Sequence, residues 1–144
     1  MKKFALGCLA ASMLVGAGFS SAIADDSIEY RQSVFKVVKW HMDTLGAMAR
    51  GDADFDADAA LHHAKQVHAM SFMAKEGFGE GTQGGAAKAE IWSNWDQFAG
   101  GMEKFQEVSG AMVAAAEEGS LQALRPAVGQ MGQTCRTCHD HFRD

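Results

Sequence analysis

Proline is nearly absent from the 144-residue sequence, cysteine is rare, and no run of basic residues occurs. A single proline leaves long segments free to form helices, because proline disrupts helix interiors. Three cysteines are too few for a disulfide-stabilised scaffold. Without a basic cluster, and with a formal net charge of −5, a nucleic-acid partner is not expected. What the sequence does have is 47% hydrophobic residues, enough for the core of one domain.

The N-terminal segment has the organisation of an export signal. Two lysines at 2–3 precede an apolar stretch at 4–19, and Ala-Ile-Ala at 22–24 has the small-x-small form that a signal peptidase recognises. The apolar stretch is shorter than the about 20 residues that a membrane-spanning helix needs, and two aspartates follow the cleavage motif. We therefore predict a cleaved secretory signal peptide at 1–24 and a mature domain at 25–144, with no membrane insertion after processing. Removing two lysines changes the formal net charge from −5 to −7.

Hydrophobic residues recur at alternating steps of three and four through most of the mature chain, which is the pattern of a helix with one buried face. This periodicity predicts helices at about 27–49, 56–75, 86–118 and 120–142. Four helices with short connections predict an all-α fold, an antiparallel, left-handed four-helix bundle. Pro126 lies beyond the first turn of the last helix, so we expect a kink or a later helix start there.

Five glycines fall within nine residues at 77–85, which excludes a helix in this segment. A phosphate-binding loop would need a preceding strand and a Gly-Lys-Ser/Thr ending, and the sequence has neither. We expect a connector in which the backbone approaches another part of the molecule closely.

One motif carries recognisable chemistry: Cys135-Arg136-Thr137-Cys138-His139. Two residues between the cysteines allow both sulfurs to reach the vinyl groups of one haem, and the histidine that follows is then an axial ligand. After signal cleavage these are the only cysteines of the chain. The motif predicts one covalently attached haem c per chain, with Cys135 and Cys138 as the thioether links and His139 as the iron ligand.

Two other uses of a cysteine pair fit the sequence less well. A thioredoxin-like redox pair needs a βαβ unit with the thiols at the start of a helix, whereas these thiols lie near the end of one. A structural zinc site needs further ligands at suitable spacing, and His62, His63 and His68 bring no second cysteine pair.

Only five residues follow the motif, so a second axial ligand or a covering residue must come from upstream. In a bundle, that position belongs to the facing side of the first helix. Arg31 and Phe35 lie in the hydrophobic register of this helix. Arg31 either reaches solvent at the end of the bundle or pairs with a haem propionate. Phe35 cannot bind iron and either packs in the core or covers the haem.

Other candidate ligands are weaker. Met42 lies 11 residues beyond Arg31 on the same face and is expected in the core. His41, His62, His63 and His68 are expected to be ordinary surface or boundary residues. Arg143 follows His139 by four residues and so lies on the same side of its helix, either as a solvated terminal charge or beside the imidazole.

Four segments spread over nearly the whole mature chain resemble bacterial cytochrome c′. They are Tyr-Arg-Gln-Ser at 30–33, Phe-Gly-Glu-Gly-Thr at 78–82 with Gly-Gly at 84–85, Glu-Ile-Trp-Ser at 90–93, and Cys-x-x-Cys-His-Asp-x-x-Arg at 135–143. The resemblance implies a periplasmic, usually dimeric four-helix bundle with a five-coordinate, high-spin haem. It further implies binding of nitric oxide, and sometimes carbon monoxide, together with slow electron transfer.

The resemblance also implies roles for individual positions. The matching positions are Cys135 and Cys138 as thioether links, His139 as the proximal ligand, Arg31 and Gln32 as haem-contacting residues, Phe35 over the vacant face of the iron, and Arg143 as the basic residue near the proximal face. The sequence departs from the commoner pattern of the family at Pro126 and at Phe35, where relatives often have leucine.

Two functions follow from these observations. An apolar cover offers no hydrogen bond to bound dioxygen, while nitric oxide needs none, so a nitric oxide-binding protein is the first hypothesis. The alternative is a low-potential periplasmic electron carrier without a gas-binding role, whose redox partner the sequence does not identify. An enzyme such as a peroxidase is not expected, because no acid–base residue accompanies Phe35 on its turn.

A homodimer is expected mainly from the family resemblance. Val34, Val37 and Trp40 lie beside the core-facing stripe of the first helix, and the sequence predicts that they form an apolar patch on the surface of a monomer.

Overall fold

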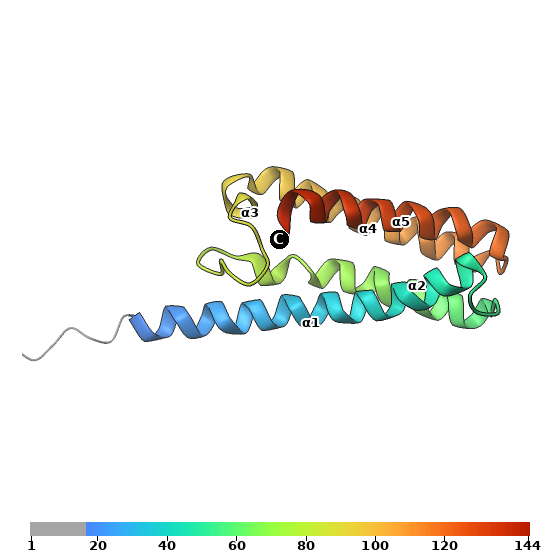
Figure 1. The fold of residues 1–144 in the computed structure, drawn as a ribbon, viewed down its shortest axis with the longest axis horizontal. Coiled ribbons are helices and arrows are strands. Elements are labelled where there is room, and N and C mark those ends of the chain that lie inside the picture. The colour runs from blue at the N-terminus through green and yellow to red at the C-terminus, as the bar shows by residue number, and fades with distance from the viewer. Residues whose placement is uncertain (1–16) are drawn as a thin grey trace, which may run out of the picture.

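The computed structural model describes residues 17–144, so positions 1–16 of the predicted signal peptide lie outside the described part. The elements are α1 (Ala17–Arg50), α2 (Ala57–Met73), the 3₁₀ turn η1 (Glu76–Phe78), α3 (Glu90–Ser93), α4 (Trp95–Glu117) and α5 (Leu121–Phe142). The four long helices lie in two neighbouring pairs, α1 beside α2 and α4 beside α5 (Figure 1). The described chain contains isolated β-bridges but no strand. The predicted all-α four-helix bundle is confirmed.

Two of the long helices begin at a capping side chain. The side chain of Asp56 accepts a hydrogen bond of 2.8 Å from the backbone N–H of Ala59 at the start of α2. The hydroxyl of Ser120 accepts one of 3.3 Å from the N–H of Ala123 at the start of α5. Each cap satisfies a donor that the first turn of a helix leaves without an intrahelical partner.

The third predicted helix is wrong at its start. A continuous helix from residue 86 was expected, whereas the long helix α4 begins at Trp95. The short α3 precedes it, and Asn94, with φ −125° and ψ 49°, separates the two. Side-chain periodicity at Ile91 and Trp95 continues across this break, so it could not reveal a change in the backbone.

Pro126 lies inside α5, which runs without a break from Leu121 to Phe142. The expectation of a later helix start is therefore wrong. Proline removes the N–H that would bond to the carbonyl of Gln122. Both residues are exposed, so water can bond to that carbonyl instead.

The core lies along the centre of the four long helices. Its fully buried members include Leu45, Val67, Phe98, Met112, Leu124 and Met131. No helix in the described part of the chain is long and apolar enough to cross a membrane.

The buried face of α1 is wider than predicted. Val34 is buried, with 6% of its surface exposed, so its assignment to an exposed patch is wrong. His41 is also buried, at 7% exposure, and is not a surface residue. α1 packs against α2, α5 and η1, and His41 contacts His63 of α2. Val37 and Trp40 remain exposed, at 41% and 62%, as the sequence predicts.

Candidate functional site

The last two turns of α5 place the two cysteines and the histidine of the motif together. Cys135 and Cys138 are half-buried, pack against the hydrophobic core and are both free thiols. Their spacing of three residues puts them on one side of the helix, and His139 is four residues from Cys135. The motif therefore presents two thiols and one imidazole to the same part of the bundle.

The surroundings of these groups favour their neutral forms. Burial raises the pKa of the Cys135 thiol, and burial together with the neighbouring Cys135 raises that of Cys138. His139 is exposed as a residue, yet the protein around its ring desolvates the imidazole and lowers its pKa. The charge of Arg143 lowers this pKa further, whereas Asp140 opposes the shift. A neutral imidazole is the form that binds a metal ion, so these residues fit a covalently attached haem.

Arg31 of α1 is the most strongly anchored polar residue near this end of the bundle. Its side chain donates hydrogen bonds to three backbone carbonyls of the glycine-rich segment, those of Gly77 at 2.8 Å, Thr82 at 2.7 Å and Gly84 at 2.7 Å. Only 4% of the residue is exposed, which excludes the alternative that it reaches solvent. A guanidinium has five N–H donors, which leaves two beyond these three bonds.

Two aromatic rings surround the same guanidinium. Its central carbon lies 4.8 Å from the ring centroid of Phe78 and 5.6 Å from that of Trp92. The indole N–H of Trp92 donates a hydrogen bond of 2.9 Å to the carbonyl of Gly79. Burial lowers the pKa of Arg31, and the three carbonyls and two π-faces stabilise its charge. Sequence reasoning missed Trp92, because nothing in the helical pattern shows which rings lie over an arginine.

The glycine-rich segment approaches α1 closely, as predicted. A β-carbon at Gly77 would lie 2.7 Å from the β-carbon of Arg31 and 3.0 Å from the carbonyl oxygen of Ser27. At Gly84, φ is +131°, and a β-carbon would lie 2.9 Å from the side chain of Ile28. Larger residues at these positions would push the segment away from Arg31.

Residues 86–88, which directly follow the glycine-rich segment, hold the end of α5. Residues Ala87 and Arg143 form an isolated antiparallel bridge. The N–H of Lys88 donates to the carbonyl of Phe142, and the N–H of Asp144 donates to the carbonyl of Ala86, both at 3.0 Å. Figure 1 shows the C-terminus beside this connection. The glycine-rich segment and the three residues after it thus join α1, near Arg31, to the helix that carries the motif. The sequence gives no local signal for this link.

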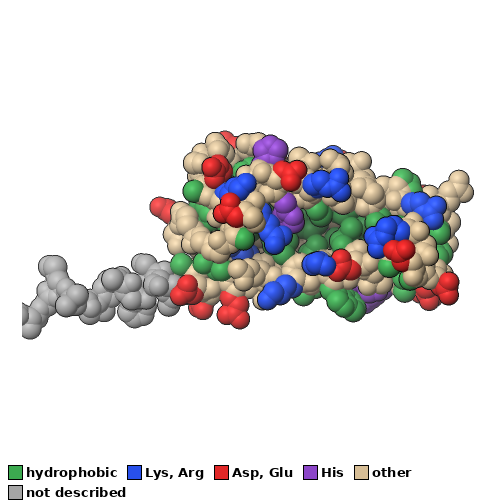
Figure 2. All heavy atoms as spheres, in the orientation of Figure 1, with side chains coloured by type: hydrophobic (Ala, Val, Ile, Leu, Met, Phe, Trp, Pro, Cys, Tyr) green, Lys and Arg blue, Asp and Glu red, His purple; other side chains and the backbone are tan. Residues whose placement is uncertain are grey.

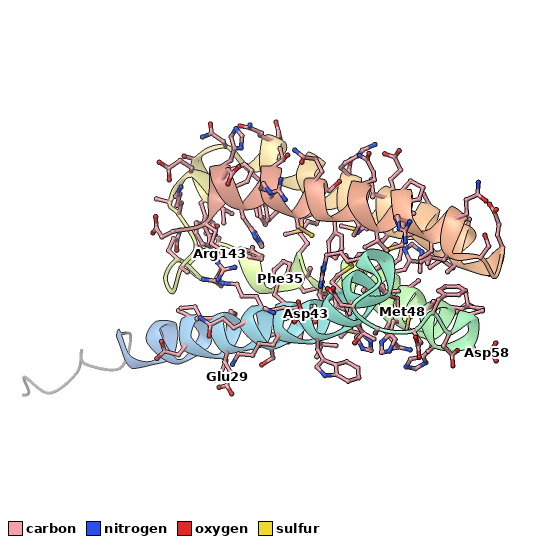
Figure 3. All side chains as sticks on the ribbon, turned by 45° about the vertical axis from the view of Figure 1, so that its right-hand side comes forward. Glu29, Phe35, Asp43, Met48, Asp58 and Arg143 are labelled. Carbon is pink, nitrogen blue, oxygen red and sulfur yellow. The ribbon has the colours of Figure 1, made fainter. Side chains whose placement is uncertain are left out.

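A hollow lies between the helix pairs next to these elements. Figure 2 shows hydrophobic side chains along its floor and lysine and arginine side chains around it. In Figure 3, Phe35 and Arg143 point from α1 and from the end of α5 into the space between these helices. Phe35 is half-buried against the core. The sequence-predicted residues are thus brought to one side of the molecule from opposite helices.

The remaining candidates lie at the margins of this arrangement. Gln32 is exposed, and its amide nitrogen lies 3.1 Å from where a β-carbon on Gly85 would be, so it borders the glycine-rich segment. Met42 is half-buried and packs against the core, as expected. His62 is exposed, whereas His63 and His68 are half-buried.

Comparison with known proteins agrees with the family resemblance seen in the sequence. The family model described as Cytochrome C' matches residues 26–143. The chain belongs to the cytochrome c′ family.

Individual relatives match over most of their length. Cytochrome c′ from Halomonas halodenitrificans is 37% identical over 127 residues, which cover 83% of this chain and 96% of the relative. The crystal structure of cytochrome c′ from Rubrivivax gelatinosus has a TM-score of 0.80 at 35% identity, covering 84% of this chain and 97% of the other. A leucine-to-isoleucine variant of the Alcaligenes xylosoxidans protein, solved as its nitric oxide complex, has a TM-score of 0.81 at 33% identity, covering 84% and 96%.

Membership of this family fixes the cofactor. Cytochrome c′ proteins carry covalent haem c, and the two free thiols near the C-terminus of this chain fit that attachment. The chain is a haem protein, as the motif predicts.

Proposed function

We propose that this cytochrome c′ binds nitric oxide, and carbon monoxide more slowly, at a five-coordinate, high-spin haem. In this proposal Cys135 and Cys138 hold the haem and His139 is its proximal ligand. The observation that carries the proposal is the position of Phe35, which points from α1 toward α5 and has no group able to bind iron. When bound, haem c supplies an iron that changes redox state and accepts small diatomic ligands.

The residues of the chain would bind and orient the haem. The two remaining donors of Arg31 are directed by its three carbonyl partners, so the guanidinium is already fixed for a propionate. Gln32 lies one residue further on, with its amide against the glycine-rich segment. Arg143 carries its charge beside His139 and favours the neutral imidazole.

Phe35 would select among ligands by exclusion. Its ring donates no hydrogen bond, so it does nothing to stabilise the polar form of bound dioxygen. Nitric oxide binds ferrous iron strongly without such a bond. A ligand entering on this face must displace a half-buried ring, which should slow carbon monoxide in particular. The nitric oxide complex of the Alcaligenes xylosoxidans variant supports diatomic binding by this fold.

The test of this role is the variant Phe35→Ala. Removing the ring should speed carbon monoxide binding to the ferrous protein by orders of magnitude and raise its affinity, measured by flash photolysis. Val37→Ala is the matched control, because this exposed residue lies on the same helix but on its outer side. If Phe35→Ala binds carbon monoxide no faster than Val37→Ala, another residue covers the iron.

The covalent attachment of the haem to the chain is tested by a separate experiment. Treatment with acidified acetone should leave the pigment on the chain, and the mass should exceed that of the apo chain by one haem. Loss of pigment would contradict thioether links through Cys135 and Cys138. His139→Ala should retain the pigment but change its absorption spectrum.

A second function, that of a low-potential electron carrier without gas binding, requires a side chain on the sixth position of the iron. On α1 that side chain would be Met42, which lies two turns beyond Phe35, but its packing against the core makes this function the second candidate. No histidine or carboxylate occurs between residues 31 and 39, so we assign no peroxidase-type enzymatic activity.

We also propose export to the periplasm with removal of residues 1–24. The family match begins at residue 26, and Figure 1 shows the N-terminal end of α1 extending beyond the other helices, both of which support cleavage near this point. The exposure of Val37 and Trp40 supports a homodimer through the outer face of α1. A monomer in sedimentation at micromolar concentration would contradict the dimer and leave the haem assignment standing.

A further inference from the structure

Three imidazole rings meet where α1 packs against α2, away from the haem-binding motif on α5. His41 comes from α1, and His62 and His63 come from α2. The ring centroids of His41 and His63 are 5.0 Å apart, those of His62 and His63 5.4 Å, and those of His41 and His62 6.0 Å. Haem binding uses none of these residues.

The centre of this group is a direct contact between two ring nitrogens. The Nδ1 atoms of His41 and His63 lie 2.8 Å apart, so one proton is shared between them. Burial lowers the pKa of both rings, and the neighbouring histidines lower them further. Both imidazoles are therefore neutral at neutral pH, the form that binds metal ions.

These distances are close to those of imidazoles that share a metal ion. Zinc binds histidine nitrogen at about 2.0–2.1 Å in a tetrahedral arrangement, which separates two bound nitrogens by about 3.3 Å and two ring centroids by about 5 Å. Within the described part of the chain, no three His, Cys, Asp or Glu side chains are already arranged to hold a metal ion. The His41–His63 pair needs only a small opening, and the exposed His62 is free to turn toward it.

We propose that His41 and His63, completed by His62 and water, bind one divalent ion of the zinc type. Neutral imidazole is a favourable ligand for zinc, copper and nickel. The ion takes the place of the proton between the two Nδ1 atoms, and this proton moves to Nε2 of its own ring, so that both imidazoles stay neutral. Because His41 belongs to α1 and the other two ligands to α2, the bound ion joins these helices.

Zinc titration of the haem-loaded protein tests this site, because zinc has no redox chemistry that would alter the haem iron. Isothermal titration calorimetry at pH 7.5 should show one Zn²⁺ bound per chain. His63→Gln should weaken binding at least 100-fold and His62→Gln at least tenfold. His68→Gln is the matched control on the same helix, because its ring bonds to Ser109 instead of to the three histidines. This control should bind zinc as the parent does.

Proton competition gives a second readout. Affinity should fall when the pH is lowered from 7.5 to 5.5, since protons and zinc compete for the same nitrogens. Should His63→Gln fail to fold, His62→Gln decides the matter, because His62 is exposed and its replacement leaves the helix contact intact. Parent protein that binds no zinc at millimolar concentration, or equal affinity of His62→Gln and the parent, would overturn the proposal.

Discussion

Replacing Arg31 by alanine tests how the glycine-rich segment is held against α1. The guanidinium is the hydrogen-bond donor for the carbonyls of Gly77, Thr82 and Gly84. The bonds to Gly77 and Thr82 are buried, and the bond to Gly84 is partly buried. In Arg31→Ala these carbonyls lose a charged donor, and the rings of Phe78 and Trp92 lose their cation.

The magnitude follows from the number and burial of these bonds. A buried acceptor left without a partner costs about 1–3 kcal/mol. The two buried carbonyls therefore predict a loss of about 2–6 kcal/mol in the free energy of unfolding. The 3.5 Å bond from the Thr82 hydroxyl to the Gly77 carbonyl, and water at Gly84, favour the lower part of this range. Arg31→Lys should lose less, because an ammonium can bond to one or two carbonyls but cannot reproduce the planar fork.

Urea denaturation followed by circular dichroism measures this loss. Arg50→Ala is the control, because this arginine lies on the same helix and its 2.8 Å ion pair with Asp52 is exposed. An exposed pair of this kind contributes about 0–1 kcal/mol. If Arg31→Ala is destabilised by no more than Arg50→Ala, the carbonyl contacts do not hold the segment and the reasoning fails.

Two further predictions concern the same end of the bundle and the histidine cluster. Gly77→Ala should destabilise the protein in urea denaturation, because the new β-carbon would lie 2.7 Å from the β-carbon of Arg31. Gly79→Ala should change the stability little, because no atom lies within 4 Å of a β-carbon there. Equal effects of the two variants would contradict the close packing at Gly77. In the folded protein the pKa values of His41 and His63 lie below the ordinary value of 6.5. The stability that these neutral rings contribute is therefore present above pH 6.5 and is lost as the pH falls through their folded-state pKa values. Unfolding free energies measured between pH 7.5 and 5 in the presence of a chelator should show this decline, and His63→Gln should reduce it.

The bundle could be predicted from the sequence because its helices follow a regular hydrophobic repeat. Three of the four predicted helices match α1, α2 and α5 in type and approximate position. The break at Asn94 could not be predicted, since the repeat describes side-chain spacing and continues across it. The burial of Val34 and His41 was missed because one stripe of residues cannot show that α1 packs against several elements.

The candidate site, too, could be predicted from the sequence only in part. The cysteines and His139 are recognisable because their chemistry depends on spacing along one helix. The partners of Arg31 come from 46 to 53 residues away and are backbone carbonyls, which no side-chain pattern can reveal. The bridge between Ala87 and Arg143 is likewise a backbone contact. Sequence reasoning therefore identified the arginine as unusual and did not find what it binds.

The proposed function depends most directly on the coordination of the haem iron. The absorption spectrum of the reduced, ligand-free protein measures this property in one step. A vacant sixth position beneath Phe35 predicts a broad high-spin band without sharp splitting. A sharp low-spin α-band would contradict this account, because it would place a side chain such as that of Met42 on the iron and favour electron transfer without gas binding.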